Sequence, residues 1–342
     1  MEKHHLDPQT VKEIEALVEE IAARVTSVHD AEFHRAAAVL AHELPRPLRE
    51  ALVDFRLREP SGALLVSGLP VDDDRLGPTP SHWHQPAGTP SPSLREEIAF
   101  GLLAQILGDP FGYATLHNGL LMHNIIPIKG YEKEQIAFGS EETLEWHTEE
   151  AFHVNRSAYT ALMCLRNPYG APTTYADVAD LEISPEDAEV LRGPWFETRP
   201  SGSHSAQRNN FAELVLAEDR ERWGRSFAET DDIHRHPVVQ PILSGHEDQP
   251  YLCIDPDCMT AVNDEAAGAL ERLCAEVNRK IQDVTLAPGD LLFMDNYRAI
   301  HGRKPFKARF DGSDRWLKRM NISRDLRPSR ARRLSPDSRI IF

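Results

Sequence analysis

Two histidines and two glutamates lie within seven positions of the segment LEWHTEEAFH, residues 144–153. In a β-strand, residues i and i+2 point to the same face, so His147 and Glu149 can aim at one point if the strand continues through them. A histidine nitrogen and a carboxylate oxygen supply two of the three ligands of a facial triad, which leaves open positions on iron(II). This segment therefore predicts part of an iron site.

The best candidate for a third ligand is His301, in the segment PGDLLFMDNYRAIHGRKPF. There APGD predicts a tight turn, LLFMDN predicts a buried strand, and the histidine begins the next strand. Such a histidine could return to the mouth of a barrel beside residues 147 and 149, because metal ligands need only converge in space.

Other residues compete for the same roles. Glu150 is the alternative to Glu149, although alternation along a strand places it on the opposite face. His153 is an alternative third ligand, and a set of His147, Glu149 and His153 would suit a zinc hydrolase. The HExxH helix of zinc peptidases is not present. A further alternative is a non-catalytic barrel that binds a metal or a small acid, with these residues in structural roles.

Two arginines follow the distal histidine and are four residues apart. Arg315 lies fourteen residues after His301, and Arg319 lies four residues further on. The planar guanidinium holds a carboxylate with two parallel hydrogen bonds, as a dicarboxylate co-substrate that chelates iron at its other end would require. A strand over this segment would place both arginines on one face.

The elements that must position these residues fall into two parts of one expected domain, residues 1–342. Apolar positions at three- and four-residue steps predict a mainly helical part over residues 1–108. Its expected helices cover 8–28, 30–42, 46–56 and 95–108, with a short buried strand at 64–66. Short alternating runs over 110–330 predict an antiparallel β-rich barrel, interrupted by a helical insert at about 182–228 and a helix at 262–280.

Composition narrows the classes of partner. Acidic residues outnumber basic ones by 54 to 38, and the formal net charge is −16. This charge disfavours nucleic acids and anionic membranes, and it suits cationic small molecules. The four cysteines show no paired spacing, and no apolar run approaches the roughly 20 residues that span a bilayer. The sequence therefore predicts a cytoplasmic enzyme or binding protein.

The HxE pair, the distal HGR and the arginine in DGSDRWLKR resemble the clavaminate synthase-like group of iron(II)/2-oxoglutarate oxygenases. More narrowly, LEWHTEEAF, TLHNG and LLFMDNYRAIHGRKPF resemble bacterial hydroxylases of free amino acids, among them the β-hydroxylases of arginine and enduracididine. The resemblance covers roughly residues 110–330. It implies a double-stranded β-helix, a jelly-roll and cupin-like core of the α+β or mainly-β class with flanking helices, and it implies iron(II), 2-oxoglutarate and O2.

The resemblance also assigns roles to individual residues. Three residues would ligate iron: His147, Glu149 and His301. Arg315 would pair with the distal carboxylate of 2-oxoglutarate, and Thr174 in APTTYADV would donate a hydrogen bond to the same carboxylate. Thr173 is the adjacent alternative, because alternation allows only one of the two threonines to face inward.

For the substrate, the resemblance implies an amino acid held at both ends. Arg319 would take its carboxylate, and an acidic residue in LCIDPDCM would take a side-chain cation. Asp255 is preferred there, and Asp257 shares its face. His117 stands in TLHNG where the family commonly has a glutamine, and it would contact the substrate backbone. Ser140 in FGS is a weaker candidate for the amino group.

The expected reaction is hydroxylation of an unactivated C–H bond, at Cβ by preference, in natural-product biosynthesis. The retained carboxylate of Glu149 favours hydroxylation over halogenation, because halide would need that coordination position. The sequence leaves arginine, enduracididine, lysine and other amino acids open as substrates, and it leaves the oligomeric state open. The polar loop at 73–94 and the segment 197–235 are candidate lids over the site.

Overall fold

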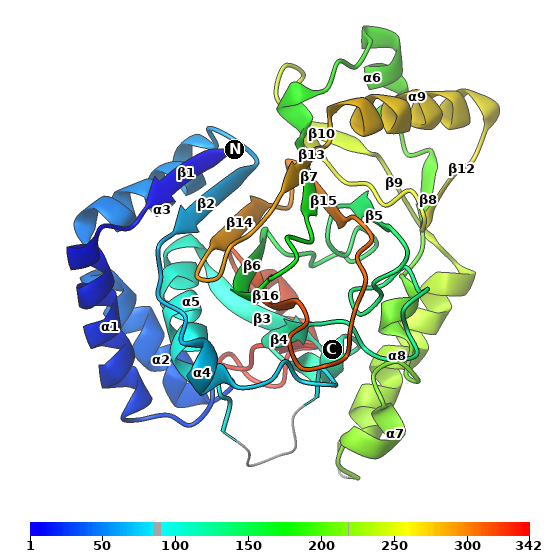
Figure 1. Cartoon of the computed structure of the whole chain (residues 1–342). Helices are drawn as coiled ribbons and strands as arrows, with labels where there is room; N and C mark the ends of the chain where they lie inside the picture. The colour runs from blue at the N-terminus through cyan, green and yellow to red at the C-terminus, as the bar shows by residue number, and fades with distance from the viewer. Residues whose placement is uncertain (85–89, 218) are drawn as a thin grey trace.

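Two β-sheets lie at the centre of the structure, a computed structural model that describes residues 1–84, 90–217 and 219–342 (Figure 1). The larger sheet has the strand order β1-β2-β14-β6-β16-β3-β17, with β4 also paired to β16. Its strands are β1 (Glu2–His5), β2 (Ala63–Ser67), β3 (Asp109–Tyr113), β4 (Met122–Ile125), β6 (Tyr159–Arg166), β14 (Leu291–Asp295), β16 (Trp316–Ser323) and β17 (Ile340–Ile341).

The smaller sheet has four strands in the order β13-β7-β15-β5, and all three pairings are antiparallel. They are β13 (Gln282–Val284), β7 (Thr173–Asp177), β15 (Ala299–Arg303) and β5 (Leu144–His147). One buried cluster joins side chains of both sheets, including Leu162 and Leu317 from the larger sheet and Tyr175 and Ala299 from the smaller one. The two sheets therefore face each other, and this confirms the expected jelly-roll core.

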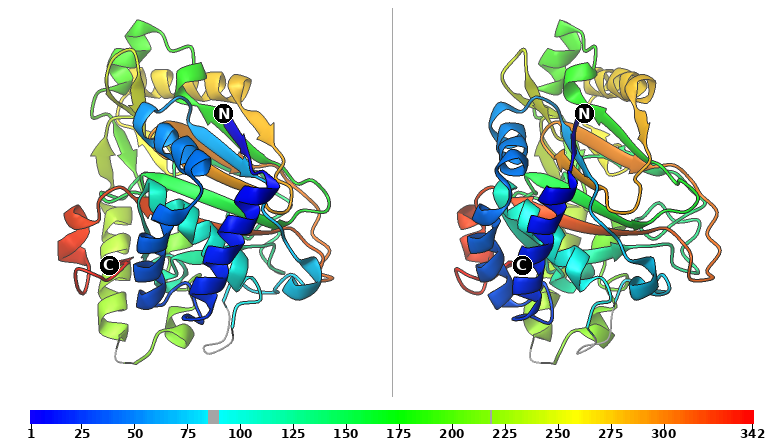
Figure 2. Two further views of the ribbon diagram at one scale, coloured as in Figure 1. Left: turned by 90° about the vertical axis from the view of Figure 1, so that its left-hand side faces the viewer. Right: turned by 60° about the vertical axis from the view of Figure 1, so that its left-hand side comes forward.

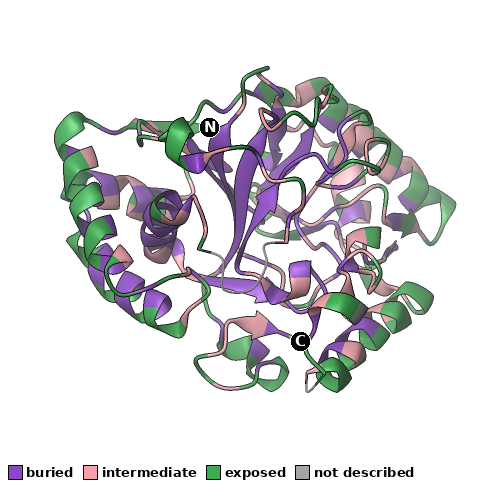
Figure 3. Ribbon diagram, turned by 60° about the horizontal axis from the view of Figure 1, so that its bottom comes forward, coloured by how far each residue is buried: buried purple, intermediate pink, exposed green. Residues whose placement is uncertain are grey.

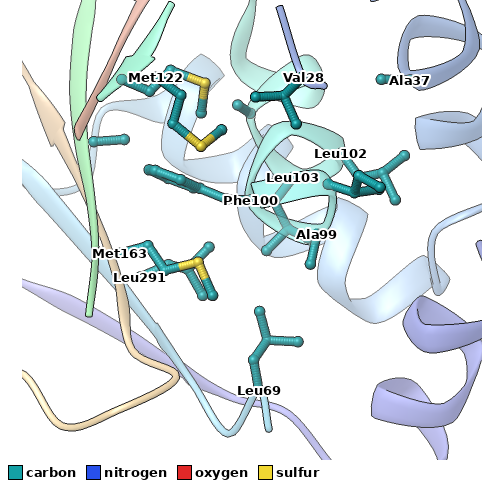
Figure 4. Close-up of a cluster of buried hydrophobic side chains, with 14 of the residues drawn as sticks. Val28, Ala37, Leu69, Ala99, Phe100, Leu102, Leu103, Met122, Met163 and Leu291 are labelled. Atoms are coloured by element: carbon teal, nitrogen blue, oxygen red, sulfur yellow. The ribbon is translucent and has the colours of Figure 1, made fainter. Parts of the chain in front are cut away.

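Helices cover the outer face of the larger sheet. They are α1 (Pro8–Ala22), α2 (Ala31–Leu40), α3 (Arg46–Arg58), α4 (Asp73–Leu76) and α5 (Leu94–Leu107). Helix α5 is apolar around most of its circumference, as expected for a helix enclosed on all sides. It packs between the other helices and strands β6 and β14 (Figure 4). The left-hand view of Figure 2 shows these helices from the outside.

The outer face of the smaller sheet is covered by α6 (Pro185–Leu191) and α9 (Asp264–Lys280). Both helices begin at polar caps that the sequence shows. The Ser184 hydroxyl accepts a hydrogen bond from the Asp187 backbone N–H, and the Asn263 side chain accepts one from Ala266. The strands stay buried inside these helical layers, while the outward faces of the helices are exposed (Figure 3).

The remaining elements form a rim on the side of β5. They are β8 (Phe196–Thr198), α7 (Phe211–Leu214), α8 (Arg220–Arg235), β9 (Val238–Gln240), β10 (Leu243–Gly245), β11 (Pro250–Leu252) and β12 (Met259–Ala261). A 3₁₀ helix over Gly202–His204 lies between β8 and α7. Within the described ranges, no helix is both long enough and apolar enough to span a bilayer.

Several expected elements differ from the structure. Among the short runs expected as strands over 110–330, the run YATLHNG (113–119) is not a strand: β3 ends at Tyr113, and three successive residues with positive φ, His117 to Gly119, turn the chain away. The first helix ends at Ala22 instead of residue 28. The insert at 182–228 also contains strand β8. Of the candidate lid 73–94, residues 85–89 lie outside the described residues.

Candidate active site

Three predicted metal ligands come together at the edge of the smaller sheet. His147 ends β5, and His301 lies directly opposite it on β15. Their ring nitrogens and a carboxylate oxygen of Glu149 all lie within 4.8 Å of one another. Across residues 1–84, 90–217 and 219–342, this is the one group of three metal-binding side chains at such spacing. The site is therefore a two-histidine, one-carboxylate triad.

The hydrogen bonds around the triad leave His147 Nε2 and Glu149 Oε2 available to bind a metal. The His147 ring lies with Nδ1 2.9 Å from the Glu145 carbonyl oxygen, and since that oxygen only accepts, Nδ1 carries the proton. This leaves Nε2 as the ligand atom. Glu149 Oε2 accepts no hydrogen bond from the described residues and lies 3.4 Å from His301 Nε2. A buried oxygen without a donor beside two imidazoles fits iron(II).

The position of Glu149 depends on contacts that the i, i+2 argument did not include. Strand β5 ends at His147, so Glu149 is not part of the ladder. Its backbone is held instead by Asn296, whose Oδ1 accepts from the Glu149 N–H at 2.6 Å and whose Nδ2 donates to the Glu149 carbonyl at 2.9 Å. Asn296 follows directly after β14, and sequence reasoning did not identify it.

The electrostatics of the site favour the metal-binding forms of these side chains. Burial alone would raise the pKa of the Glu149 carboxyl, but the Arg319 guanidinium and the His301 ring hold that pKa well below its ordinary value. Burial lowers the pKa of His301, and the Glu149 carboxylate opposes this without reversing it. At neutral pH, the site therefore presents a carboxylate and a neutral imidazole, as metal binding requires.

The competing ligands lie elsewhere. His153 Nδ1 accepts a hydrogen bond from the Asn155 backbone N–H, and the His153 ring packs 4.6 Å from the ring of Tyr113. It is not part of the metal-binding group. Glu150 adopts a positive φ of 52° and contacts His204 Nε2. The geometry therefore does not support a zinc site built from His147, Glu149 and His153.

A buried arginine, Arg315, faces the space between the two sheets. Arg315 precedes Leu317, which belongs to the inter-sheet cluster, and alternation places Arg315 on the same face. It is 6% exposed, and it forms no ion pair with any residue in the described part of the chain. Burial lowers the pKa of Arg315 to about 10. A desolvated guanidinium without a counter-charge fits a carboxylate ligand.

The threonine beside this arginine is Thr173. The expectation that Thr174 donates to the carboxylate that Arg315 binds is therefore wrong. Arg315 Nη2 donates to Thr173 Oγ1 at 3.0 Å. Tyr175 belongs to the inter-sheet cluster and Ala176 to the cluster under α9, so Thr173 faces inward and Thr174 outward. The residue pattern TTY allowed either parity, and only the pairing of β7 resolves it.

Replacing each threonine with valine tests this correction. We expect Thr173→Val to weaken 2-oxoglutarate binding by roughly tenfold, because a hydrogen bond to a charged group contributes about 1.5 kcal/mol or more. Thr174→Val, the matched control on the opposite face, is expected to change binding less than about twofold. Calorimetric titration of the iron-loaded protein under argon measures both, and equal effects of the two variants would contradict the assignment.

A second buried arginine lies near the first, and sequence reasoning did not identify it. Arg303 lies two residues after His301 on β15, opposite Thr173 on β7. It is 3% exposed, its guanidinium is near the backbone oxygens of Ser140 and Glu142, and it has no carboxylate partner in the described ranges. Burial lowers its pKa to about 10. Its position two residues from the third ligand in HGR was the available signal.

A pocket opens beside the triad, and most of the predicted substrate residues line it. His147, Glu149, Asp255, Asp257, His117 and Arg319 all contribute to its wall. The backbone of Ile254 holds this arrangement, because its carbonyl accepts from the Thr148 N–H at 2.8 Å, between the two ligands of the HxE pair. Glu145 also lines the pocket, two residues before His147, and alternation along β5 could have identified it.

The sequence analysis expected Arg319 to be available for the carboxylate of the substrate, but in the structure Arg319 already has two partners. Its Nη1 lies 2.8 Å from Glu149 Oε1, and its Nε donates to His123 Nε2 at 3.0 Å. A buried guanidinium takes the nearest carboxylate, and here that carboxylate belongs to the metal triad. Arg319 nevertheless reaches the pocket wall.

The two remaining candidates differ in position. The His117 ring stacks on His123 with ring centroids 3.9 Å apart, and neither of its ring nitrogens has a hydrogen-bond partner among the described residues. It lines the pocket. Ser140 is buried outside the pocket wall, and its carbonyl accepts from the Phe306 N–H at 2.7 Å. The expectation that Ser140 contacts the substrate is therefore not supported by this geometry.

The chain matches a known protein family. Residues 56–321 match the family described as taurine catabolism dioxygenase TauD, TfdA family. The chain is 47% identical to the enduracididine beta-hydroxylase of Streptomyces hygroscopicus, over 99% of both chains. It is 45% identical to the L-ornithine/L-arginine 3-hydroxylase of Catenulispora acidiphila, over 95% of both chains.

A solved structure is similar over the whole chain. The non-heme iron oxygenase OrfP, in complex with Fe, succinate and (3S)-hydroxy-L-Arg, superposes with a TM-score of 0.92 at 36% identity, and the match covers 100% of both chains. The same oxygenase has been solved with Fe and alpha-ketoglutaric acid, with a TM-score of 0.87. The likeness thus extends from the sequence to the arrangement of the whole fold.

Proposed function

The chain belongs to the TauD, TfdA family of dioxygenases, and we propose that it hydroxylates a free basic amino acid of the arginine or enduracididine type at Cβ. It is an amino acid hydroxylase that depends on iron(II) and 2-oxoglutarate and consumes O2. His147, Glu149 and His301 would hold the iron, and Arg315 with Thr173 would hold the distal carboxylate of 2-oxoglutarate.

The distribution of charge in the pocket carries the substrate proposal. Five carboxylates line its wall, and three of them, those of Glu145, Asp255 and Asp257, form no ion pair with a residue in the described ranges. The buried cation Arg319 also lines this pocket, beside Glu149. Unneutralised carboxylates favour a cationic side chain, and a buried guanidinium favours a carboxylate. A basic amino acid carries both groups.

This layout also favours the site of reaction. Bound iron(II) with 2-oxoglutarate and O2 supplies the oxidant that replaces a C–H hydrogen by hydroxyl, while 2-oxoglutarate is converted to succinate and CO2. An amino acid held at Arg319 by its carboxylate and at the acidic wall by its side chain would span the metal ligands. In that orientation the C–H bonds near the α-carbon, including those at Cβ, would lie next to the metal site.

The test compares substrates and one variant. Arginine, enduracididine, ornithine, lysine, glutamine and glutamate are incubated with the iron-loaded enzyme, 2-oxoglutarate and O2. Succinate release and a sixteen-dalton mass gain are measured, and NMR locates the new hydroxyl. We expect arginine and enduracididine to react best. If lysine reacted best instead, the enzyme would be a lysine hydroxylase. Preference for glutamine or glutamate would contradict the proposal.

Asp255→Asn tests the acidic wall directly. Removing one partner of a buried charge pair costs about 2 kcal/mol or more, so we expect the KM for arginine to rise by roughly 30-fold. Citrulline is the matched control substrate, because it has nearly the shape of arginine without the charge. Its KM should change little in the variant. An equal increase for both substrates would indicate a structural effect and would contradict a charge-specific role for Asp255.

A further inference from the structure

His123 lies directly opposite Arg319 in the larger sheet. The two residues are register partners on β4 and β16, and both point toward the space between the sheets, since Ile125 and Leu317 at i+2 and i−2 belong to the inter-sheet cluster. His123 Nε2 accepts the Nε–H of Arg319 at 3.0 Å. The contact joins residues 196 positions apart in the chain, and nothing in the reaction assigns His123 a role.

The surroundings of His123 keep its ring neutral. It is 4% exposed, and burial lowers its pKa well below the ordinary value, with His117, Arg319 and Lys318 adding to the lowering. A neutral ring is also what the hydrogen bond requires, because the guanidinium can only donate and Nε2 must therefore offer its lone pair.

The ring is also fixed in orientation. His117 stacks on it at an interplanar angle of 18°, and Trp83 and Phe138 pack edge-on against the His117 ring at centroid distances of 5.1 and 5.2 Å. His117 thus covers one face of the His123 ring, and Trp83 and Phe138 hold His117 in place. The acceptor for Arg319 therefore has little freedom to rotate away.

A neutral acceptor has a specific consequence for an arginine. Glu149 already supplies one negative charge to Arg319. A carboxylate at position 123 would add a second, while an apolar residue would leave the Nε–H of Arg319 buried without a partner. A neutral imidazole satisfies Nε without adding a second negative charge that would repel an anion in the pocket. The terminal nitrogens, which carry four N–H groups, then remain for Glu149 and for an anion in the pocket.

We propose that His123 is a positioning residue for Arg319: it holds the guanidinium so that the terminal N–H groups meet the carboxylate of the amino acid substrate. This inference rests on the proposed function. Because His123 acts through Arg319, it should govern recognition of the carboxylate and leave recognition of the side-chain cation unchanged.

The experiment measures binding, not turnover. Dissociation constants of L-arginine and of agmatine, which is arginine without its carboxylate, are determined by calorimetry with iron(II) and 2-oxoglutarate present under argon. We expect wild-type protein to prefer L-arginine. In His123→Leu the preference for L-arginine over agmatine should fall by roughly 10- to 100-fold, the range found when hydrogen-bond partners that orient metal ligands are removed. His123→Gln, which restores an acceptor, should keep that ratio within about threefold of wild type.

The controls separate positioning from folding. His34 on α2 is also a buried histidine, but neither of its ring nitrogens has a hydrogen-bond partner among the described residues, so His34→Leu should leave the ratio unchanged. If His123→Leu does not fold, His123→Glu replaces it, because its charge should lower the ratio in the same way. An unchanged ratio in either variant, or equal loss of L-arginine and agmatine binding, overturns the inference.

A failure of the proposed function would look different. The wild-type protein would then bind no basic amino acid and would prefer another one from the panel. That amino acid and its decarboxylated amine would replace L-arginine and agmatine in the same comparison. The ratio for that pair would then decide the role of His123 independently of the side-chain specificity.

Discussion

His301→Ala is expected to lower 2-oxoglutarate-dependent succinate formation by at least roughly 10³-fold, equivalent to about 4 kcal/mol of transition-state stabilisation. The reason is geometric. The ligand atoms of His147, Glu149 and His301 converge within 4.8 Å, and two of them cannot hold iron(II) with the open positions that the co-substrate requires. Iron content, measured by elemental analysis after gel filtration, should fall together with turnover.

His153→Gln is the matched control for this variant. His153 is a partly buried histidine six residues from His147, but its ring packs on Tyr113 outside the metal group. We expect iron content and turnover to remain near wild type. Native turnover in His301→Ala, or loss of iron in His153→Gln instead, would show that the triad is assigned wrongly. Chelation by EDTA should abolish wild-type activity, and iron(II) should restore it.

Arg315→Met is expected to raise the dissociation constant of 2-oxoglutarate by roughly 30- to 1000-fold, because truncating one side of a buried charge pair costs about 2 to 4 kcal/mol. Arg315→Lys should recover only part of this loss. Lysine offers no planar fork, and its ordinary pKa lies about two below that of arginine, in surroundings that already lower the pKa of Arg315 to about 10.

Calorimetry of the iron-loaded protein under argon measures this constant without turnover. Arg333→Met is the control, because Arg333 is 7% exposed and donates to backbone carbonyls, among them those of Leu326 and Pro336. It should lose stability but keep its affinity for 2-oxoglutarate. Wild-type affinity in Arg315→Met would require another cation, and Arg303 would then be the first to test.

The sequence could predict those parts of the site that depend on local periodicity. The arginines flanking Leu317 follow from the two-residue repeat of a strand. The same repeat selected His147 and Glu149 as a pair, although β5 ends at His147 and Asn296 holds Glu149 in place. The helices at the N-terminus and α9 follow from apolar spacing and visible caps. These features need only a few neighbouring residues to be specified.

The parts that could not be predicted depend on contacts between distant segments. Which of Thr173 and Thr174 faces inward is set by the pairing of β7 with β15, since TTY allows both parities. The support of Glu149 comes from Asn296, 147 residues later. The ion pair of Arg319 with Glu149 likewise arises only after the two sheets have come together. No local pattern records such partners.

The strand order has a consequence for how the chain is made. Strand β6 is buried along its full length, and both of its neighbours, β14 and β16, begin at Leu291 and Trp316. At about 5 to 20 residues per second, a ribosome needs roughly 6 to 25 s to travel from residue 166 to residue 291. Throughout that interval, YTALMCLR has two open edges, so we expect nascent or truncated chains to need a chaperone to avoid aggregation.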